Sequence, residues 1–189
     1  MKFEQSAFDA KPAPGCTLDM LEGDLSLRQY LLDSDFWLQR LDQLALVPRR
    51  LVICPRQELC RAGIEVLELR LQAHDGTPIR ALLGRSSFAR KGSRTRLRPA
   101  EAADPDGLDW LSLEQGTTDV ALSCPAGRRL EDRVLDVLRG MEAVCGLESV
   151  PAVAVELGWG RPAECEDAFT LAAMIRDRGW LPTPNGHQR

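Results

Sequence analysis

The sequence predicts an α/β domain built on a mixed sheet, and three observations carry this prediction. Residues 64–71 alternate apolar and charged side chains, as a half-buried strand does, and Asp75-Gly76 then supplies hairpin turn chemistry. Residues 128–144 place apolar side chains at helical spacing. Residues 150–157 form the most strand-like run of the chain. A strand, a helix and a further strand after a hairpin indicate helices packed on an at least partly parallel sheet.

The N-terminal part is expected to form an extended arm followed by helices. The arm covers residues 1–24, where prolines and a glycine in the stretch 11–15 break any periodicity. From residue 24 to 47 apolar side chains recur at roughly helical spacing, which predicts two helical segments. The second segment is expected to follow the capping residues 33–35 and to end before Pro48.

The rest of the chain is expected to alternate strands and helices after a solvated loop. The hairpin closes with a strand at 78–83, and residues 85–98 form the loop. The later elements are strands at 108–113 and 119–123, a helix at 128–144, a strand at 150–157 and a helix at 163–178 that Gly179 ends. We therefore expect one domain, residues 25–181, between the arm 1–24 and a tail at 182–189.

Composition favours an ordinary globular protein without a cofactor. The chain has 189 residues, 44% hydrophobic and 28% charged, and a net charge of −4, which disfavours disorder, nucleic acid and membrane surfaces. No apolar run approaches the roughly 20 residues of a membrane span, and the first residues do not resemble a signal peptide, so a cytoplasmic location is expected. The six cysteines form no Cys-x-x-Cys pair, and His74 and His187 are the only histidines, so we expect reduced thiols and no metal site.

The turn after the strand at 150–157 nearly matches a catalytic motif. A Gly-x-Ser-x-Gly elbow at a strand-to-helix turn carries the nucleophile of serine hydrolases. Here the residues are Gly158, Trp159, Gly160, Arg161 and Pro162, so a glycine stands at the serine position. Because glycine has no side chain to attack a carbonyl, the sequence predicts a degenerate elbow without a serine mechanism.

Several blocks occur in an order that resembles a known family. They are an acidic-Phe-Trp helix start at 35–37, the segments 64–66 and 74–79, the acidic helix 130–139 and the strand 153–158. Together they resemble the acetyl xylan esterase and cephalosporin-C deacetylase group of α/β-hydrolases. The resemblance implies a reduced α/β-hydrolase-like mixed sheet with an N-terminal helix and a β-hairpin. It also implies that Trp159 lies where substrate binds, where its ring would fill the pocket.

Three departures from that family point away from its chemistry. The region between Leu83 and Leu130 is shorter and more polar, and it lacks the His-Gly step that the family uses in its oxyanion hole. Gly160 replaces the nucleophile. The family's acid and base come from later strands, whereas His187 lies in the predicted tail. We therefore expect a catalytically inactive domain, a pseudoenzyme, that acts as a protein-binding or structural subunit.

A small enzyme remains the alternative. Cys124 precedes a predicted helix, where backbone amides lower a thiol pKa, and its spacing to Arg129 is similar to the active loop of rhodanese-like sulfurtransferases. That resemblance implies Cys124 as a persulfide carrier. Pro125 removes one amide from the loop, and a structural thiol is the competing interpretation. A carboxylic-ester hydrolase that uses rearranged groups is the other enzymatic reading.

Charged residues suggest one interaction loop and one acid. Because Phe88 is the only aromatic residue in the basic loop, a surface that faces solvent or a partner is favoured over a nucleic-acid site. Glu156 lies in an apolar strand, where burial would raise the pKa of its carboxyl unless an arginine pairs with it. A reduced sheet would leave an edge to cover, so a homo-oligomer or a protein partner is expected. The basic loop that would orient this partner contains Arg85, Arg90, Lys91, Arg94, Arg96 and Arg98.

Overall fold

The computed structural model describes residues 33–86, 94–100, 117–123, 127–151, 154–158 and 163–179. The chain divides into two units, Met1–Ser34 and Asp35–Arg189, and the elements below belong to the second apart from the first residue of α3. The predicted arm 1–24 and tail 182–189 lie outside the described residues, as does the predicted strand 108–113.

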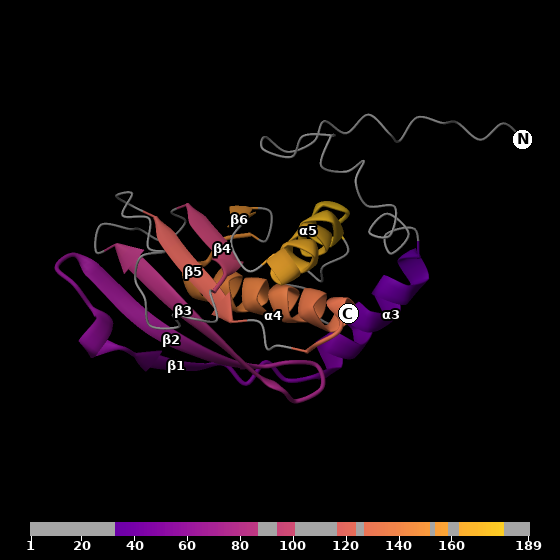
Figure 1. Cartoon of the computed structure of the whole chain (residues 1–189), viewed down its shortest axis with the longest axis horizontal. Helices are drawn as coiled ribbons and strands as arrows, with labels where there is room; N and C mark the ends of the chain where they lie inside the picture. Colours follow the sequence, from indigo (N-terminus) through magenta and orange to yellow (C-terminus); the bar gives the residue numbers. More distant parts are fainter. Residues whose placement is uncertain are drawn as a thin grey trace, which may run out of the picture. The chain divides into compact units, whose positions relative to one another are not determined.

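The described residues form one mixed sheet of six strands with helices packed on it (Figure 1). The strand order is β1-β2-β3-β5-β4-β6. β1, β2, β3 and β5 pair antiparallel, whereas β4 pairs parallel with both β5 and β6. This arrangement confirms the predicted α/β class. The elements are α3 Ser34–Leu46, β1 Val52–Pro55, the 3-10 turn η1 Gln57–Leu59, β2 Ile64–Gln72, β3 Pro78–Ser86, β4 Thr95–Pro99, β5 Thr118–Ser123, α4 Leu130–Glu148, β6 Val155–Leu157 and α5 Ala163–Asp177.

The hairpin between β2 and β3 forms where its turn residues predicted it. The Ala73 amide donates to the Thr77 carbonyl at 2.8 Å and closes the turn. Asp75 accepts the Thr77 amide at 3.0 Å, and Gly76 has φ of 87°, a conformation that glycine adopts without strain. The turn therefore sets the register that pairs Arg70 with Arg80 further along the strands.

The sheet has a helix face and an outer face. Leu69 and Leu71 of β2 are buried on the helix face, while Glu68 and Arg70 alternate with them onto the outer face. α4 packs against β4 and β5, and α5 packs against α4, β4 and β6. At Gly140 of α4, an added Cβ would lie 3.1 Å from Leu122, so this glycine allows close contact between helix and sheet.

Arg139 of α4 fastens the C-terminal end of α3. Its side chain is buried, and Nη2 donates to the carbonyls of Leu44 and Val47 at 2.7 and 2.9 Å. Nη1 donates to Glu142 at 3.0 Å. The last carbonyls of a helix lack partners within the helix, so the guanidinium supplies hydrogen bonds that α3 cannot make itself.

Each edge of the described sheet carries a feature that hinders strand addition. At the β1 edge, the Arg56 amide donates to the Val66 carbonyl at 2.9 Å. Because backbone hydrogen-bonding groups alternate in direction along an antiparallel strand, those of Ile53 and Pro55 face away from β2. Pro55 has no N–H, so it cannot donate to an added strand. At the other edge Gly158 donates to Leu97 at 2.8 Å, so the Val155 carbonyl faces away from β4. Arg176 of α5 donates to that carbonyl at 2.6 Å.

The fold corrects two predictions about elements. The loop predicted for 85–98 is wrong at both ends, because Arg85 lies in β3 and Arg96 and Arg98 lie in β4. The strand predicted for 150–157 is wrong in length, since β6 spans only Val155–Leu157. β1 was not predicted, while α4 and α5 lie where helical spacing placed them, and Gly179, with φ of 70°, follows α5 as predicted.

Candidate functional site

The strand and helix that flank the degenerate elbow are present. β6 ends at Leu157, Gly158 donates to the Leu97 carbonyl at 2.8 Å, and α5 begins at Ala163. An added Cβ at Gly158 would lie 3.3 Å from Cβ of Arg98, so the close approach of β4 accounts for this glycine. Trp159 and Gly160 lie outside the described residues, and the predicted pocket-filling role of Trp159 stays a prediction.

Of the two alternatives for Glu156, burial or pairing with an arginine, the structure shows the pairing. Its side chain is 44% exposed, and Arg94 Nε donates to its Oε1 at 2.6 Å. Arg96 lies 3.8 Å from the same carboxylate. Glu156 lies on the outer face of a short edge strand, where arginines of the neighbouring β4 segment pair with it.

The arginines of the predicted interaction loop make contacts within the chain. Arg85 donates to Glu65 at 2.6 Å and to the buried Glu148 at 3.4 Å. Arg96 lies 3.8 Å from the buried Asp119, and Arg98 also has a partner. Arg90 and Lys91 lie outside the described residues. An interaction role for this segment stays a prediction.

The thiol site also stays a prediction, because Cys124 lies outside the described residues. Arg129 precedes α4 with its side chain 79% exposed and 4.0 Å from Glu131. Its neighbour Arg128 is the buried arginine of this turn. The four described cysteines, Cys54, Cys60, Cys145 and Cys165, form no disulfide, and the described residues hold no cluster that could bind a metal.

Arg128 joins the hairpin turn to α4. It donates to Asp75 at 2.9 Å, and its Nε lies 2.8 Å from the fully buried Asp136. Burial raises the pKa of Asp136 to about 7, despite the opposing charge of Arg128. Burial also disfavours ionised Asp75, yet hydrogen bonds from Thr77 and Arg128 lower the pKa of Asp75 to about 2. His74 Nε2 lies 3.4 Å from Asp132 beside this pair.

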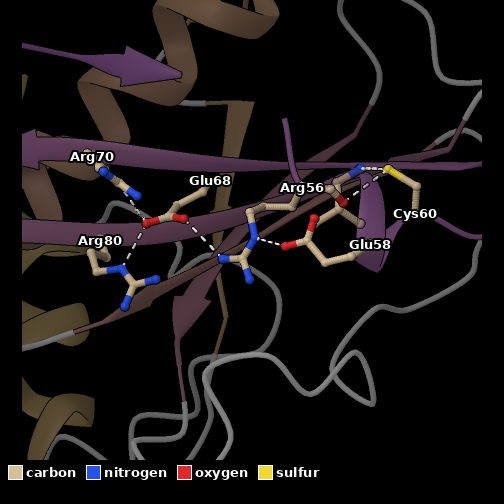
Figure 2. A network of polar contacts seen from close by, with 7 residues as sticks. Arg56, Glu58, Cys60, Glu68, Arg70 and Arg80 are labelled. Carbon is tan, nitrogen blue, oxygen red and sulfur yellow. Dashed lines mark hydrogen bonds and ion pairs between the residues drawn. The ribbon is translucent and has the colours of Figure 1, made fainter. Parts of the chain in front are cut away.

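The sequence reasoning missed a cluster of arginines around one carboxylate on the outer face, which we call the Glu68 cluster (Figure 2). Glu68 of β2 is 2% exposed. Its Oε1 accepts hydrogen bonds from Nε of Arg70 and Nε of Arg80, at 3.0 and 2.9 Å. Its Oε2 accepts one from Arg56 at 3.0 Å. Arg56 also pairs with Glu58.

The Glu68 cluster keeps its central carboxylate ionised. Hydrogen bonds from Arg70, Arg80 and Arg56 outweigh the desolvation of the carboxyl and lower its pKa to about 2. The cluster is sited by register, because Arg70 and Arg80 are directly paired residues of β2 and β3. The alternation of residues 64–71 already places Glu68 and Arg70 on one face, but Arg80 joins them only once the hairpin register is known.

A backbone carbonyl and amide anchor Cys60 beside the cluster. Its Sγ donates to the Arg56 carbonyl at 3.4 Å and accepts the Val66 amide at 3.3 Å (Figure 2). These contacts tie the turn η1 to β2 and hold the backbone of Arg56 beside Val66, to whose carbonyl the Arg56 amide donates.

Comparison with known proteins yields a fold and no family. No protein-family model and no curated protein matches the sequence. Among solved structures, an acetyl xylan esterase from Paenibacillus sp. R4 superposes with a TM-score of 0.54 at 18% identity, over 75% of this chain and 54% of that one. PEG-bound and native structures of a cold-adapted esterase from an Arctic intertidal metagenomic library give TM-scores of 0.47 and 0.46 at 11% and 12% identity. They cover 65% of this chain and 59% and 57% of theirs.

The first of these structures carries the fold assignment. This chain spans about half the length of that esterase, since it covers 54% of it. Among the described helices, none combines the length and the apolar composition that spanning a membrane requires. The mixed sheet, the helices packed on it and the likeness to the acetyl xylan esterase together show that the chain has an α/β-hydrolase-like fold.

Proposed function

We propose that this chain is a non-catalytic α/β-hydrolase-like domain that functions by binding another protein. The observation that carries the proposal is the glycine between β6 and α5. A strand and a helix flank this turn, as they do at a nucleophile-bearing turn, and the sequence has Gly160 at the position that corresponds to the attacking serine. A domain that keeps the scaffold without the nucleophile retains surfaces for binding.

The position of His74 supports the same proposal. His74 is the one histidine among the described residues, and it follows β2. In the sheet order, β3, β5 and β4 separate β2 from β6. Four strand spacings amount to about 19 Å, which is too far for an imidazole beside β2 to take a proton at the end of β6. The partner of His74 is instead Asp132 of α4.

The edges of the sheet direct the proposed binding to a face. Pro55 has no backbone N–H to donate at the β1 edge, and at the β6 edge the Val155 carbonyl already accepts a hydrogen bond from Arg176. A partner that pairs as an extra strand would meet both obstacles. Side chains on the outer face are therefore the better candidates for contact.

The catalytic half of the proposal is tested by ester turnover. Purified chain, Gly160→Ser and Cys124→Ala are incubated with 4-nitrophenyl acetate, and release of nitrophenolate is followed. We expect all three to match the buffer rate, because His74, the one histidine among the described residues, lies too far from the elbow to activate a serine placed there. Turnover by the unaltered chain that Cys124→Ala abolishes would show an enzyme with a cysteine nucleophile and overturn the proposal.

The binding half is tested by the size of the complexes that the chain forms. Chemical cross-linking in source cells, followed by mass spectrometry, is expected to give discrete adducts larger than the 20.9 kDa chain. Light scattering of the purified chain then separates self-association from a different partner. A chain that is monomeric in isolation and yields no adduct in cells contradicts protein binding.

A further inference from the structure

We infer that Arg70 and Arg80 form a clamp on the outer face that binds the carboxylate of an acidic segment of a partner protein. This inference rests on the proposed binding function and names the chemistry of the partner. Both residues lie on the outer face as a direct cross-strand pair of β2 and β3. Their side chains are 59% and 56% exposed, so each guanidinium is open to solvent.

One oxygen atom of Glu68 accepts hydrogen bonds from both arginines, and most of the N–H donors of the two guanidinium groups have no partner among the described residues. Arg70 and Arg80 each use Nε to reach the same oxygen, Oε1 of Glu68, from its two sides (Figure 2). Among the described residues, the Nη1 and Nη2 groups of these two arginines have no other partner. Glu68 therefore fixes the direction of both guanidinium groups, while the nitrogens that suit bidentate recognition of a carboxylate remain available.

The charge of the Glu68 cluster favours an anion. Its members are Arg56, Arg70 and Arg80 against Glu58 and Glu68, so the cluster keeps one positive charge in a chain whose net charge is −4. Two arginines directly opposite each other on a sheet repel. Because the single buried carboxylate between them cannot neutralise both, an incoming carboxylate would relieve the repulsion.

The clamp lies within a row of exposed outer-face residues that is longer than a small anion. The sheet register aligns four outer-face residues across β1, β2, β3 and β5: Val52, Arg70, Arg80 and Ser123. All four are exposed, and three strand spacings make the row about 14 Å long. An apolar side chain at one end, arginines in the centre and a hydroxyl at the other end match the mixed composition of protein interfaces. The row therefore fits an extended acidic peptide segment better than a free phosphate.

Fluorescence anisotropy with a fluorescein-labelled oligoglutamate peptide tests the inference. We expect the intact chain to bind the peptide, and Arg70→Gln/Arg80→Gln to bind it on the order of tenfold or more weakly. Arg61→Gln/Arg129→Gln is the matched control, because it removes the same charge from exposed sites away from the row. This control is expected to keep at least most of the affinity.

Single variants guard against a loss of folding. The double variant leaves Glu68 with Arg56 alone, so Arg70→Gln and Arg80→Gln are also measured separately, each with two guanidinium groups still on Glu68. Circular dichroism verifies that each variant is folded. Folded single variants that bind the peptide as tightly as the intact chain would overturn the clamp.

Two further arms separate this inference from its rivals. If inorganic phosphate binds the clamp as tightly as the peptide does, the site binds a small anion and the peptide assignment is overturned. If a single-stranded oligonucleotide binds more tightly than the peptide, the peptide assignment is also overturned. Absence of peptide binding, with cross-linked adducts still present in cells, would refute the clamp alone. Absence of those adducts, together with a chain that is monomeric in isolation, would refute the proposed function itself.

Discussion

At Glu68 one buried carboxylate meets three arginines, and its titration should be visible in the stability of the protein. The contacts lower its pKa from 4.5 to about 2. Because the folded-state pKa is the lower one, the stabilisation is complete above about pH 4.5 and is lost as the pH falls towards 2. The shift corresponds to roughly 2 to 3 kcal/mol at neutral pH, given that two of the arginines are exposed.

Glu68→Gln is therefore expected to lower the free energy of unfolding by about 2 to 3 kcal/mol at neutral pH and by much less near pH 2. Urea denaturation at both pH values measures the difference. Glu58→Gln serves as the control, because the Glu58 side chain is 61% exposed and its loss should change little. An equal effect of Glu68→Gln at the two pH values would contradict the assigned pKa.

Asp136 titrates in the opposite sense. Burial raises its pKa from 3.8 to about 7, so the folded state binds its proton more tightly than the unfolded state does. Its contribution to stability is therefore present below about pH 3.8 and declines as the pH rises towards 7. The charged groups around it are Arg128, which opposes the shift, and Asp75 and Asp132, which add to it.

Asp136→Asn should remove this dependence on pH. The difference in unfolding free energy between the unaltered protein and the variant is expected to shift in favour of the variant as the pH rises from 4 to 7, by a few kcal/mol. Chemical denaturation across this range provides the measurement. A difference that stays constant would mean that Asp136 is ionised throughout, as an ordinary ion-pair partner of Arg128.

Single residues were the least predictable part of the candidate site. Gly160 was identified by spacing alone, since the elbow motif is local in sequence. The partners of Glu156, in contrast, depend on which strand lies beside β6, and the sequence does not state that order. Arg129 was singled out for its spacing to Cys124, whereas the contacts of Arg128 depend on the packing of the hairpin turn on α4, which spacing does not reveal.

Among the elements, α4 offers a comparison between two glycines in one helix. At Gly146 an added Cβ would have Arg49 Nη1 as its nearest neighbour, at 3.9 Å, whereas at Gly140 it would lie 3.1 and 3.2 Å from two methyl carbons of Leu122. Gly146→Ala should stabilise the protein by about 0.5 to 1 kcal/mol through helix propensity. Gly140→Ala should gain less or lose stability, because Leu122 must move. Thermal unfolding of both variants tests the ranking, and a larger gain at Gly140 would contradict the close packing.

Elements with strong periodicity were predicted, and short ones were not. α4, α5 and the hairpin each present one apolar face over many residues. β4 alternates as well, with Thr95, Leu97 and Pro99 buried, but its two arginines made it resemble a solvated loop. β1 has only four residues, two of them exposed and apolar, so it lacks a pattern that a sequence window can detect.

For the whole molecule, the protected edges predict how the protein behaves at high concentration. Pro55→Thr restores a donor at the β1 edge, and Arg176→Gln releases the Val155 carbonyl at the β6 edge. The double variant is expected to form larger species in light scattering as its concentration rises, beyond those of the unaltered chain. Arg178→Gln, an exposed arginine near Arg176, is the charge control. Equal masses for the double variant and the control would show that these residues do not protect the edges.

The topology of the whole sheet was predictable only as a class. A hairpin followed by alternating helices and strands indicates a mixed sheet, and the described residues confirm it. The order in which β5 lies between β3 and β4 depends on long-range pairing, which period and turn chemistry do not encode. The resemblance to the esterase family also left the order of the strands open.

The hydrogen bonds from Arg139 to α3 also bear on the order of events during synthesis. The Leu44 carbonyl lies 95 positions before its donor and the Val47 carbonyl 92 positions before it. When α3 leaves the ribosome, the guanidinium that completes its last turn has not yet been made. A nascent chain stopped before residue 139 therefore carries α3 without these two hydrogen bonds, which can form only after Arg139 has been translated.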